Sequence, residues 1–134
     1  MAKADKTKEL IDGLNKDLAG ELAAVIQYTI YGAVAKGAHR PTLVSFFEGE
    51  IPDELGHAKF LANKIAALGG TPTTKPNPVP VPDTNRGLLE EVLKAETQAI
   101  ADYTERVEQA EAAGETGLKV QLEDQILDET NHRE

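Results

Sequence analysis

The chain has 134 residues, which is enough for one domain with a real core but too few for two independent domains. It contains no cysteine, so disulfides, iron–sulfur clusters and thiolate zinc sites are excluded, and any metal must be bound by carboxylate, imidazole or water. The net charge of −9 argues against a nucleic-acid partner and favours the attraction of cations.

Apolar residues recur at helical spacing along the whole chain, and no segment alternates like a β-strand. This spacing predicts four helices in a single domain, over residues 5–36, 43–69, 84–113 and 117–134. Glycine and proline separate the first helix from the second, and a short glycine-containing turn separates the third from the fourth. Short loops join antiparallel neighbours, so two helical hairpins are expected.

The linker over residues 70–83 is rich in proline and is predicted to be extended. In that form it reaches about 43 Å, whereas the second helix is about 39 Å long. The linker can therefore run the whole length of the molecule. This reach permits an all-α four-helix bundle with up-down-down-up topology and one long crossover between the second and third helices.

Each predicted helix has a carboxylate on the apolar stripe that would face the core of a bundle. In the third helix this stripe reads Leu89, Leu93, Glu96, Ile100, Tyr103 and Val107. No lysine or arginine is expected on any of the four stripes. Because buried carboxylates need a compensating charge, we predict that metal cations provide it. The candidate ligands are Glu21, Glu54, His57, Glu96, Glu129 and His132.

A repeat relates the two predicted hairpins. Adding 75 to positions 21, 54 and 57 gives positions 96, 129 and 132, so one Glu followed by a Glu-x-x-His motif occurs twice in register. Two similar hairpins related by a pseudo-two-fold axis would place these ligands face to face. In each Glu-x-x-His motif the two residues share one helix face. Hard carboxylates with two imidazoles suit iron or manganese better than calcium or magnesium.

The motifs Glu54-Leu55-Gly56-His57 and Glu129-Thr130-Asn131-His132, with Glu21 and Glu96, resemble the ligand set of the ferritin-like di-iron carboxylate superfamily. The stretch over residues 14–28 is most similar to the bacterioferritin branch, and Dps-like ferritins are close to it. The resemblance implies that Glu54 and Glu129 bridge two iron ions. It further implies that one ion is completed by Glu21 with His57, the other by Glu96 with His132, and that the activity is oxidation of Fe(II) by O₂ or H₂O₂.

The sequence departs from this family pattern in two places. Bacterioferritins bind haem through a methionine that follows the first bridging glutamate, and Leu55 stands there in this chain, whose only methionine is Met1. No haem is therefore expected. The sequence also stops two residues after His132, which shortens the fourth helix and weakens the expectation of a storage shell, although Dps-like shells lack a fifth helix.

Five further residues are candidates for supporting the metals. Tyr28 is predicted either as redox or hydrogen-bonding support or as an ordinary core residue, and Tyr103 as a buried tyrosine bonded to a carboxylate. Asp53 and Asp128 either face water or accept a hydrogen bond from a ligand histidine of the other hairpin. Glu50 is either a carboxylate through which iron enters or a partly exposed rim residue.

Three functional hypotheses follow. The first is a non-haem ferroxidase that oxidises Fe(II) with O₂ or H₂O₂ for storage or detoxification and forms a homo-oligomer. The second is a di-iron or di-manganese peroxidase, catalase or oxidase that forms no cage. The third is a structural or interaction bundle whose polar stripe residues only set helix register. The charged N-terminus is followed by no apolar run, so we expect a cytoplasmic protein with no membrane partner.

Overall fold

The computed structural model describes residues 2–133, except for the side chains of residues 132 and 133. It contains four helices, α1 (Lys3–Val34), α2 (Arg40–Ala67), α3 (Asn85–Ala112) and α4 (Thr116–Arg133). No described residue lies in a strand, so the predicted all-α class is confirmed. α2 begins three positions earlier than predicted, at 40 instead of 43, because proline is tolerated in the first turn of a helix.

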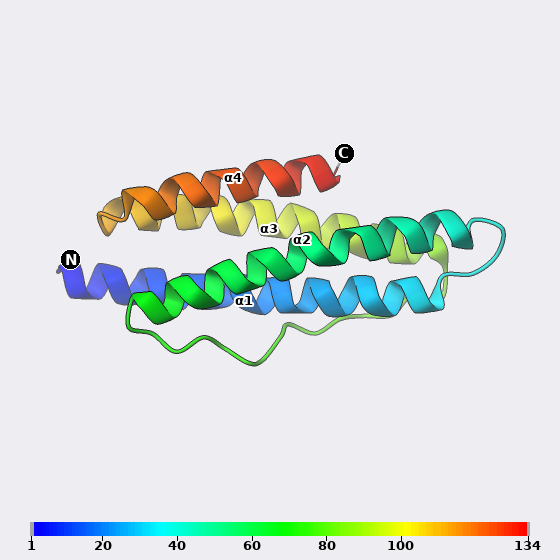
Figure 1. Cartoon of the computed structure of the whole chain (residues 1–134), viewed down its shortest axis with the longest axis horizontal. Coiled ribbons are helices and arrows are strands. Elements are labelled where there is room, and N and C mark those ends of the chain that lie inside the picture. Colours follow the sequence, from blue (N-terminus) through cyan, green and yellow to red (C-terminus); the bar gives the residue numbers. More distant parts are fainter. Residues whose placement is uncertain (1, 134) are drawn as a thin grey trace.

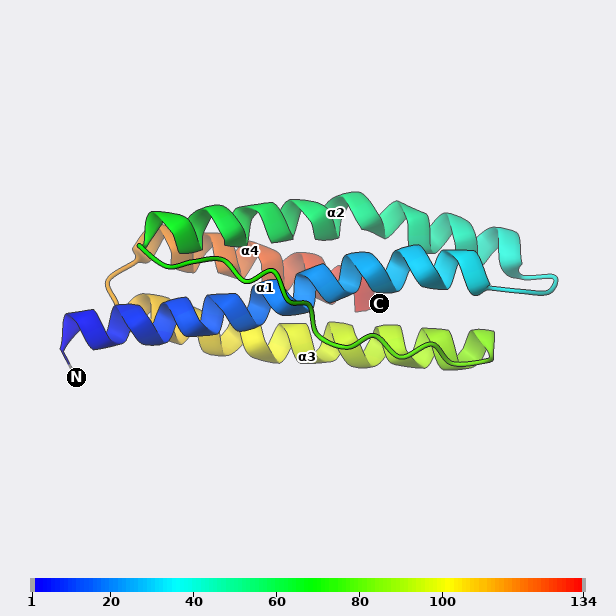
Figure 2. The same cartoon turned by 90° about the horizontal axis from the view of Figure 1, so that it is seen from below.

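The helices form an elongated bundle in which α1 packs along α2 and α3, and α4 packs along α3. Between α2 and α3 the chain has no helix or strand, and it runs along the outside of the bundle from one end to the other (Figure 2). As a result α2 and α3 point in the same direction. The predicted up-down-down-up bundle with one long crossover is confirmed.

The crossover, residues 68–84, is attached to α1 at several points. The backbone N–H of Asn77 donates to the carbonyl of Ala19 at 3.1 Å. The hydroxyl of Tyr31 donates to the carbonyl of Pro80 at 2.5 Å. Gly69, with φ of 92°, turns the chain out of α2 in a conformation that favours glycine. These contacts keep the extended segment against α1 although it has no secondary structure of its own.

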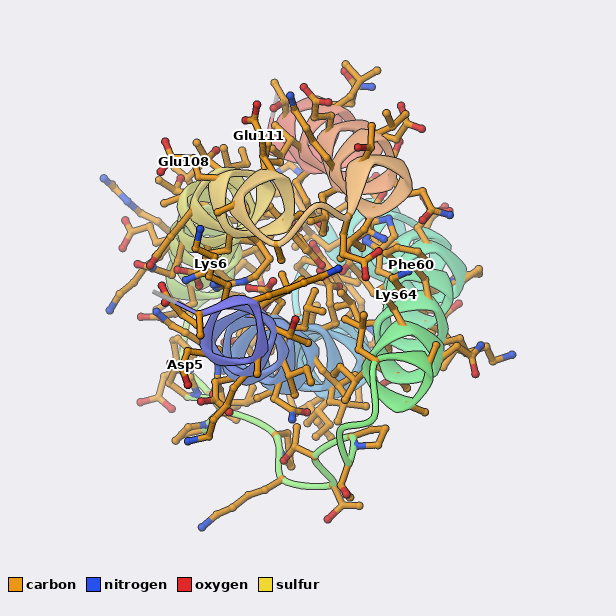
Figure 3. All side chains as sticks on the ribbon, turned by 90° about the vertical axis from the view of Figure 1, so that its left-hand side faces the viewer. Asp5, Lys6, Phe60, Lys64, Glu108 and Glu111 are labelled. Atoms are coloured by element: carbon orange, nitrogen blue, oxygen red, sulfur yellow. The ribbon has the colours of Figure 1, made fainter. Side chains whose placement is uncertain are left out.

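Two apolar clusters form the core, one toward each end of the bundle. The cluster at the end shown in Figure 3 includes Leu14, Leu61, Ile65, Leu118 and Leu122. The other cluster includes Tyr28, Tyr31, Phe47, Leu88 and Val92. In α1, α2 and α3 the predicted carboxylate ligand lies, along the helix, between residues of the first cluster and residues of the second. In α4 it follows the residues of the first cluster. The apolar core therefore encloses a polar layer near the middle of the bundle.

The predicted stripe of α3 is wrong in its first two turns. Leu88 and Val92 are buried, whereas Leu89 and Leu93 are 41% and 50% exposed. Ile100 and Val107, which continue the face of Leu93 at seven-residue spacing, are partly buried. The difference arises because α4 packs on the later turns of α3, and the first turns of α3 extend beyond the end of α4 (Figure 1).

None of the four described helices combines the length and the apolar character needed to cross a membrane.

Candidate metal centre

The polar layer contains one buried glutamate from each helix. These residues are Glu21 of α1, Glu54 of α2, Glu96 of α3 and Glu129 of α4. All four line a single cavity of about 350 Å³ that extends between α1 and α3 and beneath the crossover. The helices thus bring the four predicted carboxylate ligands to one place in the bundle.

Four of the predicted ligands converge closely. Donor atoms of Glu21, Glu54, His57 and Glu129 all lie within 4.8 Å of one another, and all four residues are buried. Nδ1 of His57 lies 3.2 Å from Oε1 of Glu129 and 3.7 Å from Oε2 of Glu21. It also lies 3.8 Å from Oε2 of Glu54. This spacing leaves room for an ion bound to nitrogen and oxygen donors at about 2.0–2.6 Å.

The donor set fits a metal for a second reason. Oε2 of Glu21 is buried and has no hydrogen-bond partner among the described residues. A buried carboxylate oxygen without a donor is costly, and a cation removes that cost. Glu96 lines the same cavity but lies outside the group of four, and the side chain of His132 lies outside the described part of the chain. The second half of the predicted ligand set therefore stays a prediction.

The two tyrosines of the repeat bond to the carboxylates in a reciprocal way. The hydroxyl of Tyr103 donates to Oε1 of Glu21 at 2.5 Å, and the hydroxyl of Tyr28 donates to Oε1 of Glu96. Each tyrosine thus binds the glutamate of the other hairpin. Burial, together with the neighbouring glutamates, raises the pKa of both hydroxyls above their ordinary value, so both remain protonated donors.

On the other side of His57, Nε2 lies 3.2 Å from Oδ2 of Asp128 on α4. This contact leaves Nδ1 directed at the carboxylates, which is the arrangement that fixes a histidine ligand. Asp53 is exposed on α2, and its predicted partner, His132, has no described side chain. Glu50 is half-buried one turn before Glu54 and lies outside the converging group. The roles of these residues stay predictions.

Burial and charge shift the protonation of the group. Burial, and then the close approach and charge of Glu21, raise the pKa of Glu54 to about 12. Burial alone would lower the pKa of His57, but the nearby carboxylates of Glu129 and Glu21 outweigh this and raise the pKa to about 11. Without a metal, Glu54 is therefore neutral and His57 is positive at neutral pH. The two protons take the place of positive charge that a metal would bring.

A buried ion pair next to this layer was missed. Nε of Arg106 lies 2.9 Å from Oδ2 of Asp17, and Nη2 lies 3.2 Å from Oδ1. Both residues are buried, so an arginine faces the core from a position outside the four predicted stripes. Gly13 makes room for the guanidinium, because a Cβ at that position would overlap it. A signal was present in the spacing, since Asp17 lies one turn before Glu21 and Arg106 lies one turn after Tyr103.

The fold and the site define the class of protein. The ferritin-like domain family matches residues 11–134, and the chain belongs to this family. Its site contains buried glutamates and a histidine that could hold metal. The predicted relationship to ferritin-like di-iron carboxylate proteins is confirmed.

Individual relatives agree with this assignment. A crystal structure of ferritin-like, diiron-carboxylate proteins from Bacillus anthracis str. Ames is 49% identical with a TM-score of 0.95, over 99% of this chain and 94% of that one. A bacterial ferritin from Paramagnetospirillum magnetotacticum is 32% identical over 92% of this chain and 76% of its own length. Dps from Thermosynechococcus elongatus, at 19% identity and a TM-score of 0.92 over 99% of this chain and 90% of that one, shares the fold.

Proposed function

We propose that this protein is a non-haem ferroxidase that binds two iron ions in the carboxylate layer and oxidises Fe(II) with O₂ or H₂O₂. The observation that carries the proposal is the convergence of Glu21, Glu54, His57 and Glu129 on one buried point in a ferritin-like bundle. The position of Glu96 on the same cavity supports a second ion beside the first. Manganese fits the same donors.

The residues have distinct parts in this proposal. Glu54 and Glu129 come from opposite hairpins and would bridge the ions, while Glu21 with His57 would complete one ion and Glu96 with His132 the other. When bound, the metals supply the redox change and a place for the oxidant. The tyrosine hydroxyls hold one oxygen of Glu21 and one of Glu96, which fixes how each carboxylate lies in the wall of the cavity.

The surroundings support the proposal further. The cavity under the crossover reaches all four glutamates, so a small oxidant can approach them without displacing a helix. Leu55, at the position of the haem-binding methionine, is partly exposed and has no donor atom, which supports a centre without haem. We propose a homo-oligomeric, cytoplasmic protein, in keeping with its resemblance to bacterial ferritins.

Stopped-flow absorbance after mixing the metal-free protein with Fe(II) and oxidant tests this function. Wild type should oxidise iron rapidly, whereas Glu54→Ala and Glu129→Ala should not. Glu123→Ala is a matched control, because Glu123 is exposed on α4. Equal oxidation rates in wild type and both bridging variants would contradict the proposal.

One observation favours a second function, oxidation of a small organic substrate or peroxide without iron storage. The cavity of about 350 Å³ is larger than O₂ requires, and its lining residues include Gln27, Lys94 and Gln98. Native mass spectrometry with elemental analysis separates the two. A cage with a large iron load supports storage, whereas a small oligomer with two metals per chain supports substrate oxidation.

A further inference from the structure

The two halves of the proposed centre share one kind of polar contact between α1 and α3, in which a tyrosine hydroxyl donates to a glutamate. Tyr103 of α3 donates to Glu21 of α1, and Tyr28 of α1 donates to Glu96 of α3. Both contacts link the same pair of helices, which lie side by side along the bundle (Figure 2). At this level the pseudo-two-fold symmetry of the sequence is preserved in the structure.

On the Glu21 side a second polar contact joins the same helices one turn away. Two nitrogens of Arg106 donate to the carboxylate of Asp17, at 2.9 and 3.2 Å, and each of the two residues is no more than 5% exposed to solvent. Nη1 of Arg106 also donates to Oε1 of Gln109 at 2.5 Å. α1 and α3 are thus linked by polar contacts on consecutive turns, one from Tyr103 to Glu21 and one from Arg106 to Asp17.

On the Glu96 side, the residues that the structure describes form no such ion pair. By the 75-residue offset, Val92 is the counterpart of Asp17, and Tyr31 is the counterpart of Arg106. Both belong to the apolar cluster, together with Leu88, which is the counterpart of Gly13. The hydroxyl of Tyr31 donates to Pro80 of the crossover, not to α3. Apolar packing therefore replaces the ion pair on this side.

The two arrangements constrain the helices differently. A bidentate pair of buried charges holds a single geometry, because a shift of either helix weakens two charge-assisted hydrogen bonds and exposes unpaired charge to an apolar interior. Apolar contacts are not directional. Arg106 and Tyr103 share one face of α3, so the ion pair fixes the height at which the Tyr103 hydroxyl meets Glu21. The free oxygen of Glu21, Oε2, then stays 3.7 Å from Nδ1 of His57.

We propose that Asp17 and Arg106 are positioning residues that make the two metal positions unequal. The position formed by Glu21 and His57 is held ready by the ion pair and binds a divalent ion first. The position formed by Glu96 and His132 lacks the ion pair and binds the second ion more weakly. This inference rests on the proposed two-metal centre.

Calorimetric titration of the metal-free protein with Co(II) tests the inequality directly. Wild type should bind two ions per chain in separate steps, with affinities that differ by about ten-fold or more. Glu21→Ala should remove the tighter step and Glu96→Ala the weaker one. Two equal steps in wild type, or loss of the tighter step in Glu96→Ala alone, would overturn the inference, as would the binding of no Co(II) at all.

Variants of the ion pair test its part in the inequality. Asp17→Val combined with Arg106→Tyr copies Val92 and Tyr31 onto the Glu21 side and should weaken the tighter step by about ten-fold, which makes the two steps similar. Arg106→Lys keeps the charge but loses the bidentate hydrogen bonding to Asp17, so it should also weaken the tighter step. Gly13→Ala adds a Cβ that would displace the guanidinium without substituting either residue of the pair, and it provides a third route to the same result.

Leu118→Ala is the control for a purely structural effect. Leu118 is fully buried at the same end of the bundle but does not join α1 to α3. This variant should lower the melting temperature and keep the ratio of the two affinities. If folded Arg106→Lys and Gly13→Ala proteins, checked by circular dichroism, also keep that ratio, the positioning role is wrong. Unequal Co(II) binding without Fe(II) oxidation would refute the proposed ferroxidase and leave this inference standing.

Discussion

Metal binding should release protons, and the structure gives their number. In the metal-free protein, the pKa of Glu54 is about 12 and that of His57 is about 11, so both hold a proton throughout the range from pH 6 to 8. A carboxylate or imidazole must lose its proton before it binds a metal through that atom. Binding at these two residues therefore releases two protons. Each proton changes the affinity ten-fold per pH unit, so the affinity should rise about a hundred-fold per unit, or about 2.7 kcal/mol.

Calorimetric titration with Co(II) at pH 7 in two buffers of different ionisation enthalpy measures the released protons directly. Glu54→Gln should release one proton fewer, because its amide carries no ionisable proton. Glu48→Gln is the control, since Glu48 is exposed on the same helix and lies outside the converging group. A wild-type release of less than one proton, or an affinity independent of pH between 6 and 8, would refute the reasoning.

The same protonation makes the metal-free protein sensitive to pH. The pKa values of Glu54 and His57 in the folded chain lie above their ordinary values of 4.5 and 6.5, so folding takes up protons. The stabilisation is complete below pH 4.5 for Glu54 and below pH 6.5 for His57, and it is lost as the pH rises toward the folded values. Chemical denaturation should therefore show a more stable metal-free protein at pH 6 than at pH 8, and bound metal should reverse this trend.

Three substitutions test other parts of the structure. Leu61→Ala should lower the free energy of unfolding by about 2–5 kcal/mol in urea denaturation, because this side chain is fully buried; a loss below 1 kcal/mol would contradict its place in the core. Tyr103→Phe removes the donor to Glu21 and should lower the free energy of unfolding by about 1–3 kcal/mol. It should also weaken Co(II) binding in calorimetry, and unchanged binding would contradict the role of this hydroxyl. Tyr31→Phe removes the hydrogen bond to Pro80, so it should lower the free energy of unfolding by about 1 kcal/mol and speed proteolysis within the crossover. Equal cleavage rates in variant and wild type would show that this hydrogen bond does not hold the crossover.

The carboxylate layer could be predicted because two independent patterns coincide. Helical spacing places Glu21 and Glu96 on apolar stripes, and the 75-residue repeat relates them and their Glu-x-x-His partners. The crossover could be predicted because a proline-rich segment cannot be helical and its reach matches a helix length. Composition and spacing therefore determine the bundle and the position of the four glutamates around one cavity.

The remaining features depend on contacts between helices. Leu88 and Leu89 are adjacent leucines, and the choice of which one is buried depends on how far α4 covers α3. Asp17 and Arg106 have the charges of surface residues in sequence, and their burial becomes visible only when α1 and α3 lie together. Spacing identifies a helix face, but it cannot show which charged residues on that face have a partner across the interface.

The central claim is a two-metal centre that depends on the bridging glutamates. Native mass spectrometry with elemental analysis, after anaerobic loading of the metal-free protein with Fe(II), tests it most directly. Two iron ions per chain are expected in wild type, with clear loss of iron in Glu54→Ala and Glu129→Ala and no loss in Glu123→Ala. Absence of bound iron in wild type, or two ions per chain in both bridging variants, would contradict the account.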